Sequence, residues 1–431
     1  MLRSSISLVE LPWKRTDSRT RFALIAVLVS AFSVRLGVRI AFGEDYFWTN
    51  SYSAYYALAE NVVSHKGLCF QTTCAWWPPL YPLFLAVTAL LGKHYVLIVV
   101  PQALIGTGTV LLAFLIGKEI FCARAGLIAS IITAFYPYYV MHDTALQETG
   151  MITFIVALSV WLLLRASRLN RGHDWFLAGL ALGAIALTRA STAPFIPLAV
   201  IWTAWIGAPG SISERLSKAI VIVMALTVTV GPWLIRTWRI TGAPVLSSQT
   251  GRALWIGNNP DTFSFYPNQS IDLSTAAAAA KLSVQDRAEL ERSENEIGKS
   301  RWFAAKGVAF IRQHPWLTIR RVLPKLLAGF SWRLNPLREW PAQSSYFCTY
   351  APVSILGPLG MFLTRRRRET LLIAMAFVSF ISVSAVFWAH TSHRTYLDIY
   401  LIIFVASTLH NVALSCPAAF VSTRDVRRQV N

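Results

Sequence analysis

Long apolar runs dominate this chain. Hydropathy marks about ten membrane-spanning segments, at residues 22–42, 95–117, 125–141, 149–165, 174–188, 192–207, 219–235, 349–363, 371–388 and 396–415. Runs of this length and polarity are typical of helices that cross a bilayer. The pattern therefore predicts an all-α polytopic membrane protein.

A further apolar stretch, residues 79–92, decides the predicted topology. As a helix it would reach only about 21 Å at 1.5 Å per residue, so we expect an amphipathic surface helix or a re-entrant helix. With the N-terminus inside, the cytoplasmic segments then hold 19 Lys and Arg residues. If the stretch crossed instead, residues 365–368, which are all Arg, would face outward, against the positive-inside rule. We therefore expect both termini to be cytoplasmic.

This topology divides the chain into three parts. Residues 1–235 form an N-terminal membrane module with a first external loop at 43–94, residues 236–347 form an external cap, and residues 348–431 supply C-terminal membrane helices and a basic cytoplasmic tail. Within the cap, residues 274–313 have a helical pattern that ends at His314-Pro315. The cap carries 15 Lys and Arg against 8 Asp and Glu. An anionic substrate, a lipid headgroup or solubility alone would explain that excess.

Composition and charge narrow the class further. Hydrophobic residues make up 55% of the 431 residues and charged residues 14%, which argues against a soluble enzyme. The net charge of +19 would suggest nucleic acid in a soluble protein. Here basic cytoplasmic loops and contacts with lipid phosphate account for it, and no nucleic-acid module is recognisable, so we expect a lipid bilayer and no nucleic acid as partners.

The first apolar run and the cysteines indicate how the chain is anchored and which thiols could pair. Residues 22–42 are followed by charged and aromatic residues rather than by a small-residue cleavage site, which predicts a retained anchor. The five cysteines lack the paired spacing of a zinc site. Cys69 and Cys74 share the first external loop, where they form either a disulfide or two free thiols.

Polar residues collect at the predicted external ends of the spans. They are Glu44, Asp45, His142, Asp143, Glu148, Arg189, His390, His393 and Arg394. Carboxylates facing cations at a membrane surface suit transfer chemistry on a lipid-linked phosphate, because a carboxylate can deprotonate an acceptor while cations stabilise the departing phosphate. Arginine offers phosphate a planar, bidentate partner.

A series of short motifs then occurs in a telling order. They are YYALAEN at 55–61, WWPPLYPLFLAV at 76–87, LQET at 146–149, ALTRAST at 186–192, GPWLIRTWRITGAPV at 231–245 and HRTY at 393–396. The series resembles the membrane-embedded C-type glycosyltransferases, in the group of the protein O-mannosyltransferases and the lipid A aminoarabinose transferase. The resemblance implies a transferase that moves a sugar from a polyprenyl-phosphate donor to a glycan, lipid or protein acceptor, at the exoplasmic face of the plasma (inner) membrane.

The resemblance also implies which residues do the chemistry. The family often places an Asp shortly before a Tyr-x-x-x-Ala run, and this chain has Asn50 and Ser51 there, so either Asp45 takes the role or the base has been lost. We expect an inverting displacement in which Asp45, helped by Glu44 or Glu148, activates the acceptor. The lipid phosphate would be bound by Arg189, His393 and Arg394, with further substrate contacts from Tyr55, His142, Asp143 and His390.

Metal dependence and two other functions stay open. The acids Glu44, Asp45 and Glu148 could bind Mg²⁺ or Mn²⁺, although a single acid commonly suffices for such chemistry. A transporter or lipid flippase also needs many spans and buried charges. A non-catalytic subunit of a glycan assembly complex would explain a missing Asp.

Overall fold

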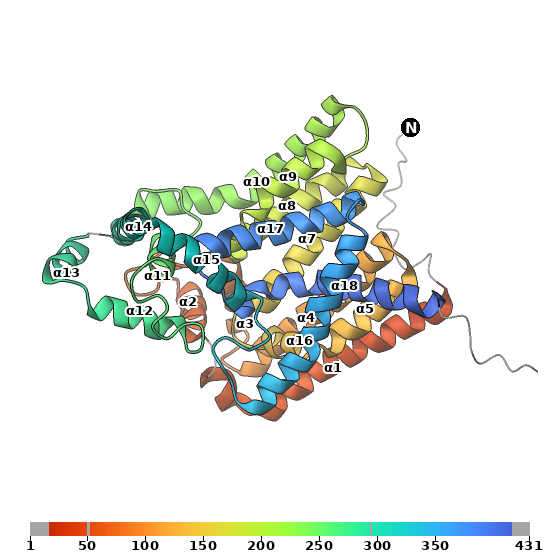
Figure 1. The fold of residues 1–431 in the computed structure, drawn as a ribbon, viewed down its shortest axis with the longest axis horizontal. Helices are drawn as coiled ribbons and strands as arrows, with labels where there is room; N and C mark the ends of the chain where they lie inside the picture. The colour runs from red at the N-terminus through yellow and green to blue at the C-terminus, as the bar shows by residue number, and fades with distance from the viewer. Residues whose placement is uncertain (1–16, 50–51, 294, 416–431) are drawn as a thin grey trace, which may run out of the picture.

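The computed structural model describes residues 17–49, 52–293 and 295–415, and these are almost entirely helical (Figure 1). Within this part of the chain the one β feature is an isolated bridge between Phe70 and Thr73. Seven described elements are long and apolar enough to cross a membrane. They are α1 (Ser18–Thr49), α4 (Tyr95–Ile120), α7 (Thr149–Leu169), Ala190–Gly207, α10 (Ile212–Thr241), α16 (Trp340–Leu363) and α17 (Arg368–Val386).

The remaining predicted spans also coincide with helices of the bundle. α8 (Gly172–Thr188) and α18 (Thr391–Ser415) are single helices, and Ala190–Gly207 is built from η1 (Ala190–Thr192), α9 (Phe195–Trp202) and η2 (Thr203–Gly207). The predicted span 125–141 is a broken pair, α5 (Ala123–Phe135) and α6 (Pro137–Asp143). The chain is an integral membrane protein, and the predicted all-α polytopic architecture is confirmed.

The break between α5 and α6 has a local cause. Tyr136 is extended, with φ −69° and ψ 109°, because the ring of Pro137 disfavours helical backbone in the residue before it. Pro137 then begins α6, where its missing N–H costs nothing. The result is a separate short helix that ends with His142 and Asp143.

The first span is longer than predicted. α1 bends at Gly43, whose φ of 79° and ψ of 175° suit glycine, and helical backbone then resumes as far as Thr49. Glu44 and Asp45 therefore lie on a helical extension after the bend rather than in an irregular loop.

The first predicted external loop is compact. It contains α2 (Ser53–Val63) and α3 (Leu80–Ala89), separated by a loop in which Cys69 and Cys74 form a disulfide. The ten residues of α3 extend about 15 Å, so the apolar stretch 79–92 is too short to cross, as predicted.

The cap residues 236–347 include five helices around a small apolar cluster, against which Trp388 from outside the cap also packs. They are α11 (Thr250–Gly257), α12 (Ile271–Ala280), α13 (Val284–Glu291), α14 (Glu296–Gln313) and α15 (Pro315–Gly329). The prediction of one helical stretch over 274–313 was wrong in its continuity, because Ser283 forms a capping box with Asp286 and Asn295 caps α14. Its predicted end at His314-Pro315 is where α14 gives way to α15.

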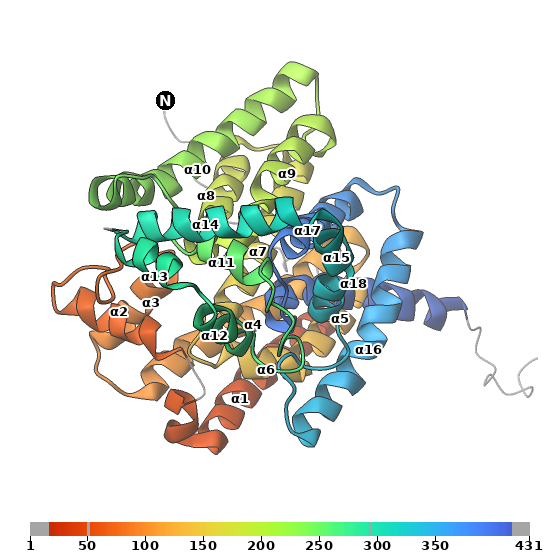
Figure 2. The ribbon, with the colours of Figure 1, turned by 60° about the vertical axis from the view of Figure 1, so that its left-hand side comes forward.

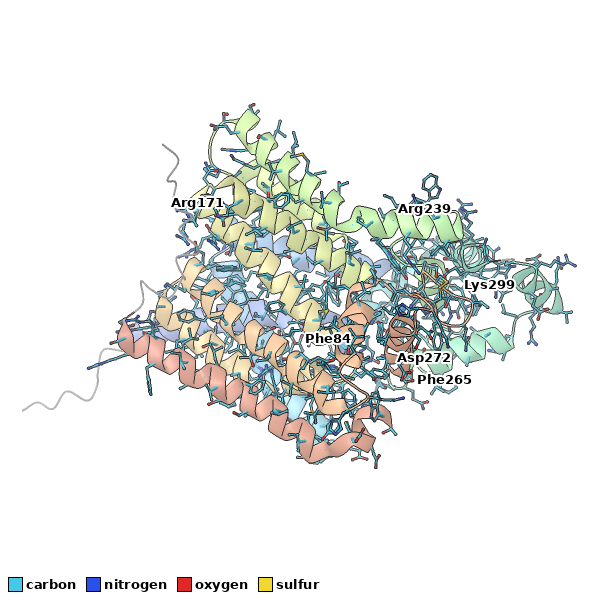
Figure 3. All side chains as sticks on the ribbon, turned by 180° about the vertical axis from the view of Figure 1, so that it is seen from behind. Phe84, Arg171, Arg239, Phe265, Asp272 and Lys299 are labelled. Atoms are coloured by element: carbon cyan, nitrogen blue, oxygen red, sulfur yellow. A yellow bond between two sulfur atoms is a disulfide. The ribbon has the colours of Figure 1, made fainter. Side chains whose placement is uncertain are left out.

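The cap and the first loop lie together at one end of the bundle, and the short basic connections lie at the other (Figures 1 and 2). Contacts at the basic end include an ion pair of Arg168 with Glu119 and a hydrogen bond from Arg367 Nη1 to the Ile120 carbonyl. Figure 3 shows Arg171 at this end and Phe265, Asp272 and Lys299 at the cap end. Which end faces the cytoplasm remains a prediction.

Candidate active site

The central feature of the cap end is an ion pair between Glu148 and Arg189. α7 and α8 are consecutive packed helices, so the residue that precedes α7 and the residue that follows α8 meet. Arg189 Nε lies 3.0 Å from Glu148 Oε1, and Arg189 Nη2 lies 2.9 Å from the same oxygen and 3.0 Å from Thr149 Oγ1. The third nitrogen, Nη1, is buried and has no hydrogen-bond partner in the structure. One charged donor of this guanidinium therefore lacks an acceptor within the protein.

Three half-buried histidines lie close to this pair. His142 is the last residue but one of α6. It contacts Gln147 and the ring of Tyr138, the latter at 4.3 Å between ring centroids. His390 and His393 flank the start of α18, with 5.7 Å between their ring centroids. Burial first, and then the charges of Arg338 and Arg189, lower the pKa of His390 to about 4. His390 is therefore neutral at pH 7.

Arg338 was not among the residues that the sequence suggested. It is exposed and lies between α15 and α16, yet its charge acts on His390 and on the hydroxyl of Tyr52. The prediction counted the positive charge of the cap as a whole and singled out no member. A signal was present, since Arg338 stands just before a Trp-Pro pair that begins an apolar helix.

Tyr55 of α2 lies beside the same carboxylate. Burial, followed by the negative charge of Glu148, raises the pKa of Tyr55 well above its ordinary value, so the phenol stays protonated. Its ring packs against Tyr81 and Trp77, at centroid distances of 5.1 and 5.4 Å. The structure thus brings Tyr55, Glu148, Arg189 and the histidines into one region.

The other two predicted acids lie elsewhere. Glu44 and Asp45 are both exposed, and the contacts described for them stay within α1. Glu44 accepts a hydrogen bond of 3.1 Å from the Trp48 indole, and the Asp45 carbonyl accepts one of 2.7 Å from Thr49. Their catalytic role stays a prediction to which these contacts add nothing.

Arg394 occupies a different environment from the one predicted. It is fully buried and forms a bidentate pair with Asp398, with Nε to Oδ1 at 2.8 Å and Nη2 to Oδ2 at 3.2 Å. Nη1 donates to the Gly329 carbonyl at 2.9 Å, and Nη2 also donates to the Tyr346 hydroxyl at 3.1 Å. Since these internal acceptors engage the guanidinium, the structure gives Arg394 a structural position instead of a free phosphate-binding one.

Asp143 is likewise enclosed. Its Oδ2 accepts from Arg35 Nε at 2.8 Å, and both side chains are buried. Arg35 lies well inside the first span, where a charge is tolerated when it is paired. Asp143 therefore joins α1 to α6 through Oδ2, while its buried Oδ1 has no hydrogen-bond partner in the structure.

The described residues include no group of three or more His, Cys, Asp or Glu side chains arranged to hold a metal ion. The acids Glu44, Asp45 and Glu148, which the sequence offers for Mg²⁺ or Mn²⁺, are thus not such a group.

Comparison with known proteins adds to this geometry. Residues 77–235 match the family described as dolichyl-phosphate-mannose-protein mannosyltransferase. "Putative mannosyltransferase YkcB" of Bacillus subtilis strain 168 is 34% identical over 102 residues, which are 23% of this chain and 14% of that protein. The matched part of YkcB is therefore a small one.

Solved structures show a similar fold. The Archaeoglobus fulgidus oligosaccharyltransferase tethered with an acceptor peptide gives a TM-score of 0.53 at 14% identity, covering 94% of this chain and 51% of that chain. The same organism's AglB, in complex with an inhibitory peptide and a dolichol-phosphate, also gives 0.53 at 14% identity, covering 93% and 51%. The chain thus spans about half the length of these oligosaccharyltransferases.

ArnT from Cupriavidus metallidurans, bound to undecaprenyl phosphate, gives a TM-score of only 0.42 at 14% identity, covering 91% and 78%. The likeness of fold therefore depends on the oligosaccharyltransferase structures, and the likeness to the family depends on residues 77–235. Together they confirm the resemblance to the membrane-embedded C-type glycosyltransferases of the protein O-mannosyltransferase group that the motifs predicted.

Proposed function

We propose that this chain is a membrane glycosyltransferase that takes a sugar from a polyprenyl-phosphate donor at the cap end of the bundle. The observation that carries the proposal is the Glu148–Arg189 pair, with the unpartnered Arg189 Nη1, among three histidines and Arg338. The family match and the dolichol-phosphate in the AglB complex support the donor class. We take the cap end to be exoplasmic and the membrane to be the plasma membrane.

Arg189 and Arg338 bind the donor phosphate in this proposal. Arg189 is held in place by Glu148 and Thr149, so that binding an anion through Nη1 costs little further ordering. Arg338 is exposed and completes the charge from the cap side. Neutral His390 and His393 add hydrogen-bonding nitrogens without adding charge.

Glu148 is our choice of base. The oxygen of an acceptor hydroxyl attacks the anomeric carbon and forms a new C–O bond, while the bond from that carbon to the phosphate oxygen breaks. The leaving polyprenyl phosphate keeps the electron pair, and the acceptor proton passes to Glu148. Attack opposite the leaving group inverts the anomeric centre. The guanidinium groups stabilise the charge that develops on the phosphate.

For the sugar and the acceptor we propose only which compounds to test first. Mannose is named by the matching family and by YkcB, so a polyprenyl-phosphate mannose is the first donor to test. A glycan, a lipid and a peptide should each be offered as acceptor.

The test uses the full chain in lipid nanodiscs and measures sugar transfer per folded protein. Arg189→Ala should raise the donor KM by about ten- to a hundredfold, because it removes a charge-assisted contact of roughly 1.5 to 3 kcal/mol. Arg189→Lys should recover only part of this, since lysine lacks the planar fork. Glu148→Gln should lower kcat by about a hundredfold or more, the range of general base catalysis.

Asp45→Asn and Glu44→Gln are the matched controls and should stay near wild type. Loss of transfer in Asp45→Asn with normal turnover in Glu148→Gln would return the base to the first span. A folded wild-type chain that binds the donor without transferring sugar would overturn the enzymatic proposal in favour of a non-catalytic subunit.

A further inference from the structure

The last helix of the cap, α15, has an inverted distribution of polar and apolar side chains. Its outward stripe is apolar, with exposed fractions of 77% for Trp316, 60% for Ile319, 62% for Leu323 and 60% for Leu327. The spacing of these residues, by three or four positions, places them on one face of the helix. A helix on the surface of a water-soluble domain has the opposite pattern.

The inward face of α15 is cationic. Arg321 donates from Nη1 to the Asn259 carbonyl at 2.7 Å and from Nη2 to the Pro260 carbonyl at 3.1 Å. Lys325 is fully buried, with Nζ 3.1 Å from Asn258 Oδ1 and 3.3 Å from the carbonyl of Ala385 in α17. Both charges are thus satisfied inside the protein while the apolar stripe has no cover.

Contacts just after the C-terminal end of α15 show how far along the membrane helices this part of the chain lies. Phe330 packs on Phe380 at 5.4 Å between ring centroids, and Phe380 lies six residues before the end of α17, about 9 Å along its axis. Trp332 donates to Ser354 Oγ at 2.8 Å, and Ser354 lies well inside α16. The chain therefore descends beside the membrane helices directly after α15.

The uncovered stripe adjoins exposed apolar surface on two of the candidate membrane helices. α15 packs on α17, and exposed apolar residues continue along α16 and α17 at Phe347, Ile355, Val378 and Ile381. Figure 2 shows α15 in front of α18 and next to α17, the two membrane helices on which it packs. Arg312, Arg320 and Arg333 are exposed around the stripe, where lipid phosphates would meet them.

We infer that α15 is a membrane-interface helix, with Trp316, Ile319, Leu323 and Leu327 in contact with lipid acyl chains. The cap is then a partly immersed structure, attached to the bilayer along one side. Its outer helix α13, which has no buried residue, lies in water by contrast. This inference does not depend on the proposed enzymatic activity.

Spin labels can test the position of α15. In a full-length chain with Cys122, Cys348 and Cys416 replaced by Ser, single cysteines would be introduced as Leu323→Cys and Ile319→Cys. Val284→Cys on α13, where Val284 is 89% exposed, is the aqueous control, and Val228→Cys in the middle of α10, where Val228 is 65% exposed, is the lipid control. Power saturation in nanodiscs of phosphatidylethanolamine and phosphatidylglycerol compares access of oxygen and of the water-soluble nickel complex NiEDDA.

The labels at 319 and 323 should favour oxygen and lose NiEDDA access relative to the label at 284, as the label at 228 does. NiEDDA access equal to that at 284 would overturn the inference, because it would place the stripe in water. Labels shielded from both reagents would also overturn it, since a second copy or another protein would then cover the stripe.

Discussion

Two arginines at the cap end show that the surrounding side chains decide what role an arginine can have. Arg189 and Arg394 were predicted together as phosphate ligands because each stands at the predicted external end of a span. The structure gives Arg189 an unpartnered nitrogen, whereas Arg394 is engaged by Asp398, Gly329 and Tyr346. The i,i+4 spacing of Arg394 and Asp398 was the signal in the sequence that separates the two cases.

Arg394→Ala should therefore destabilise the fold and leave donor binding alone. It would strand the buried carboxylate of Asp398, at a cost of about 3–5 kcal/mol, and Arg394→Lys should rescue little because lysine cannot reproduce the bidentate pair. Thermal unfolding in nanodiscs measures the loss. Arg394→Met combined with Asp398→Leu removes both charges and should be more stable than Arg394→Ala. A raised donor KM in Arg394→Ala at normal stability would restore the phosphate assignment.

His390 should make stability depend on pH. Its folded-state pKa is lowered to about 4 from 6.5, and its Nδ1 accepts a hydrogen bond of 3.1 Å from the Ser392 backbone N–H, which protonation would abolish. Between pH 6.5 and 4 the unfolded state binds more protons, so stability falls as the pH falls through this window. The melting temperature of wild type should drop from pH 7 to pH 5 more steeply than that of His390→Asn, which retains an acceptor. Parallel slopes would contradict this.

At the scale of elements, hydropathy located the membrane helices but not the bends within them. Pro137 predicts the division of α5 from α6, and Gly43 permits the bend in α1, yet both lie inside or beside apolar runs that average out such signals. Which distant elements contact each other was even harder to predict from the sequence. Arg338, in the connection before α16, acts on His390, which precedes α18, and the fold alone brings these two connections close together.

The joint between the cap and the first loop is a second pairing of this kind. Glu296, the first residue of α14, accepts hydrogen bonds from the backbone N–H groups of Cys74 at 2.9 Å and Ala75 at 3.0 Å, and from Ser248 Oγ at 2.7 Å. Arg236, in α10, donates to the Cys74 carbonyl at 2.8 Å. The disulfide-closed loop is thus fixed on both sides by polar contacts.

Glu296→Ala should loosen this joint. Each charge-assisted bond is worth about 1.5–3 kcal/mol, so the amides of Cys74 and Ala75 should exchange with deuterium faster, while Glu296→Gln, which keeps an acceptor oxygen, should show a smaller change. Hydrogen exchange of the peptide 69–77 measures the effect. Glu289→Ala on α13 is the matched control, because Glu289 contacts Trp302 within the cap. Equal exchange in all variants would mean that the joint does not order the loop.

For the whole molecule, the predicted membrane topology matters most, because it decides on which side of the membrane the proposed site lies. The ten spans, the uncrossed stretch 79–92 and the charge bias together predicted which connections share a side, and the structure places the cap and the basic connections at opposite ends of the bundle. This separation follows because successive membrane helices alternate in direction. Orientation in the membrane depends on the charges facing each compartment, which the fold does not contain.

Reporter fusions can establish that orientation. A fusion at Arg366 should report the cytoplasm and one at Ser283 the external side, because residues 365–368 are four consecutive Arg residues at one end of the bundle. Alkaline phosphatase and green fluorescent protein at each position give opposite readouts. External activity at Arg366 would reverse the orientation and move the proposed site to the cytoplasmic face.

The Glu296 joint also has a consequence for the order of biosynthesis. Its partners Cys74 and Glu296 are 222 residues apart, so at about 5–20 residues per second the ribosome adds the carboxylate roughly 10 to 45 s after the loop that it holds. During that interval α4 to α10 must enter the membrane while the loop waits without its acceptor. The cysteines, five positions apart, can close within the nascent chain long before the joint is complete. Nascent chains arrested before residue 236, which lack both Arg236 and Glu296, would therefore carry an oxidised but undocked first loop, which a protease could distinguish from the finished protein.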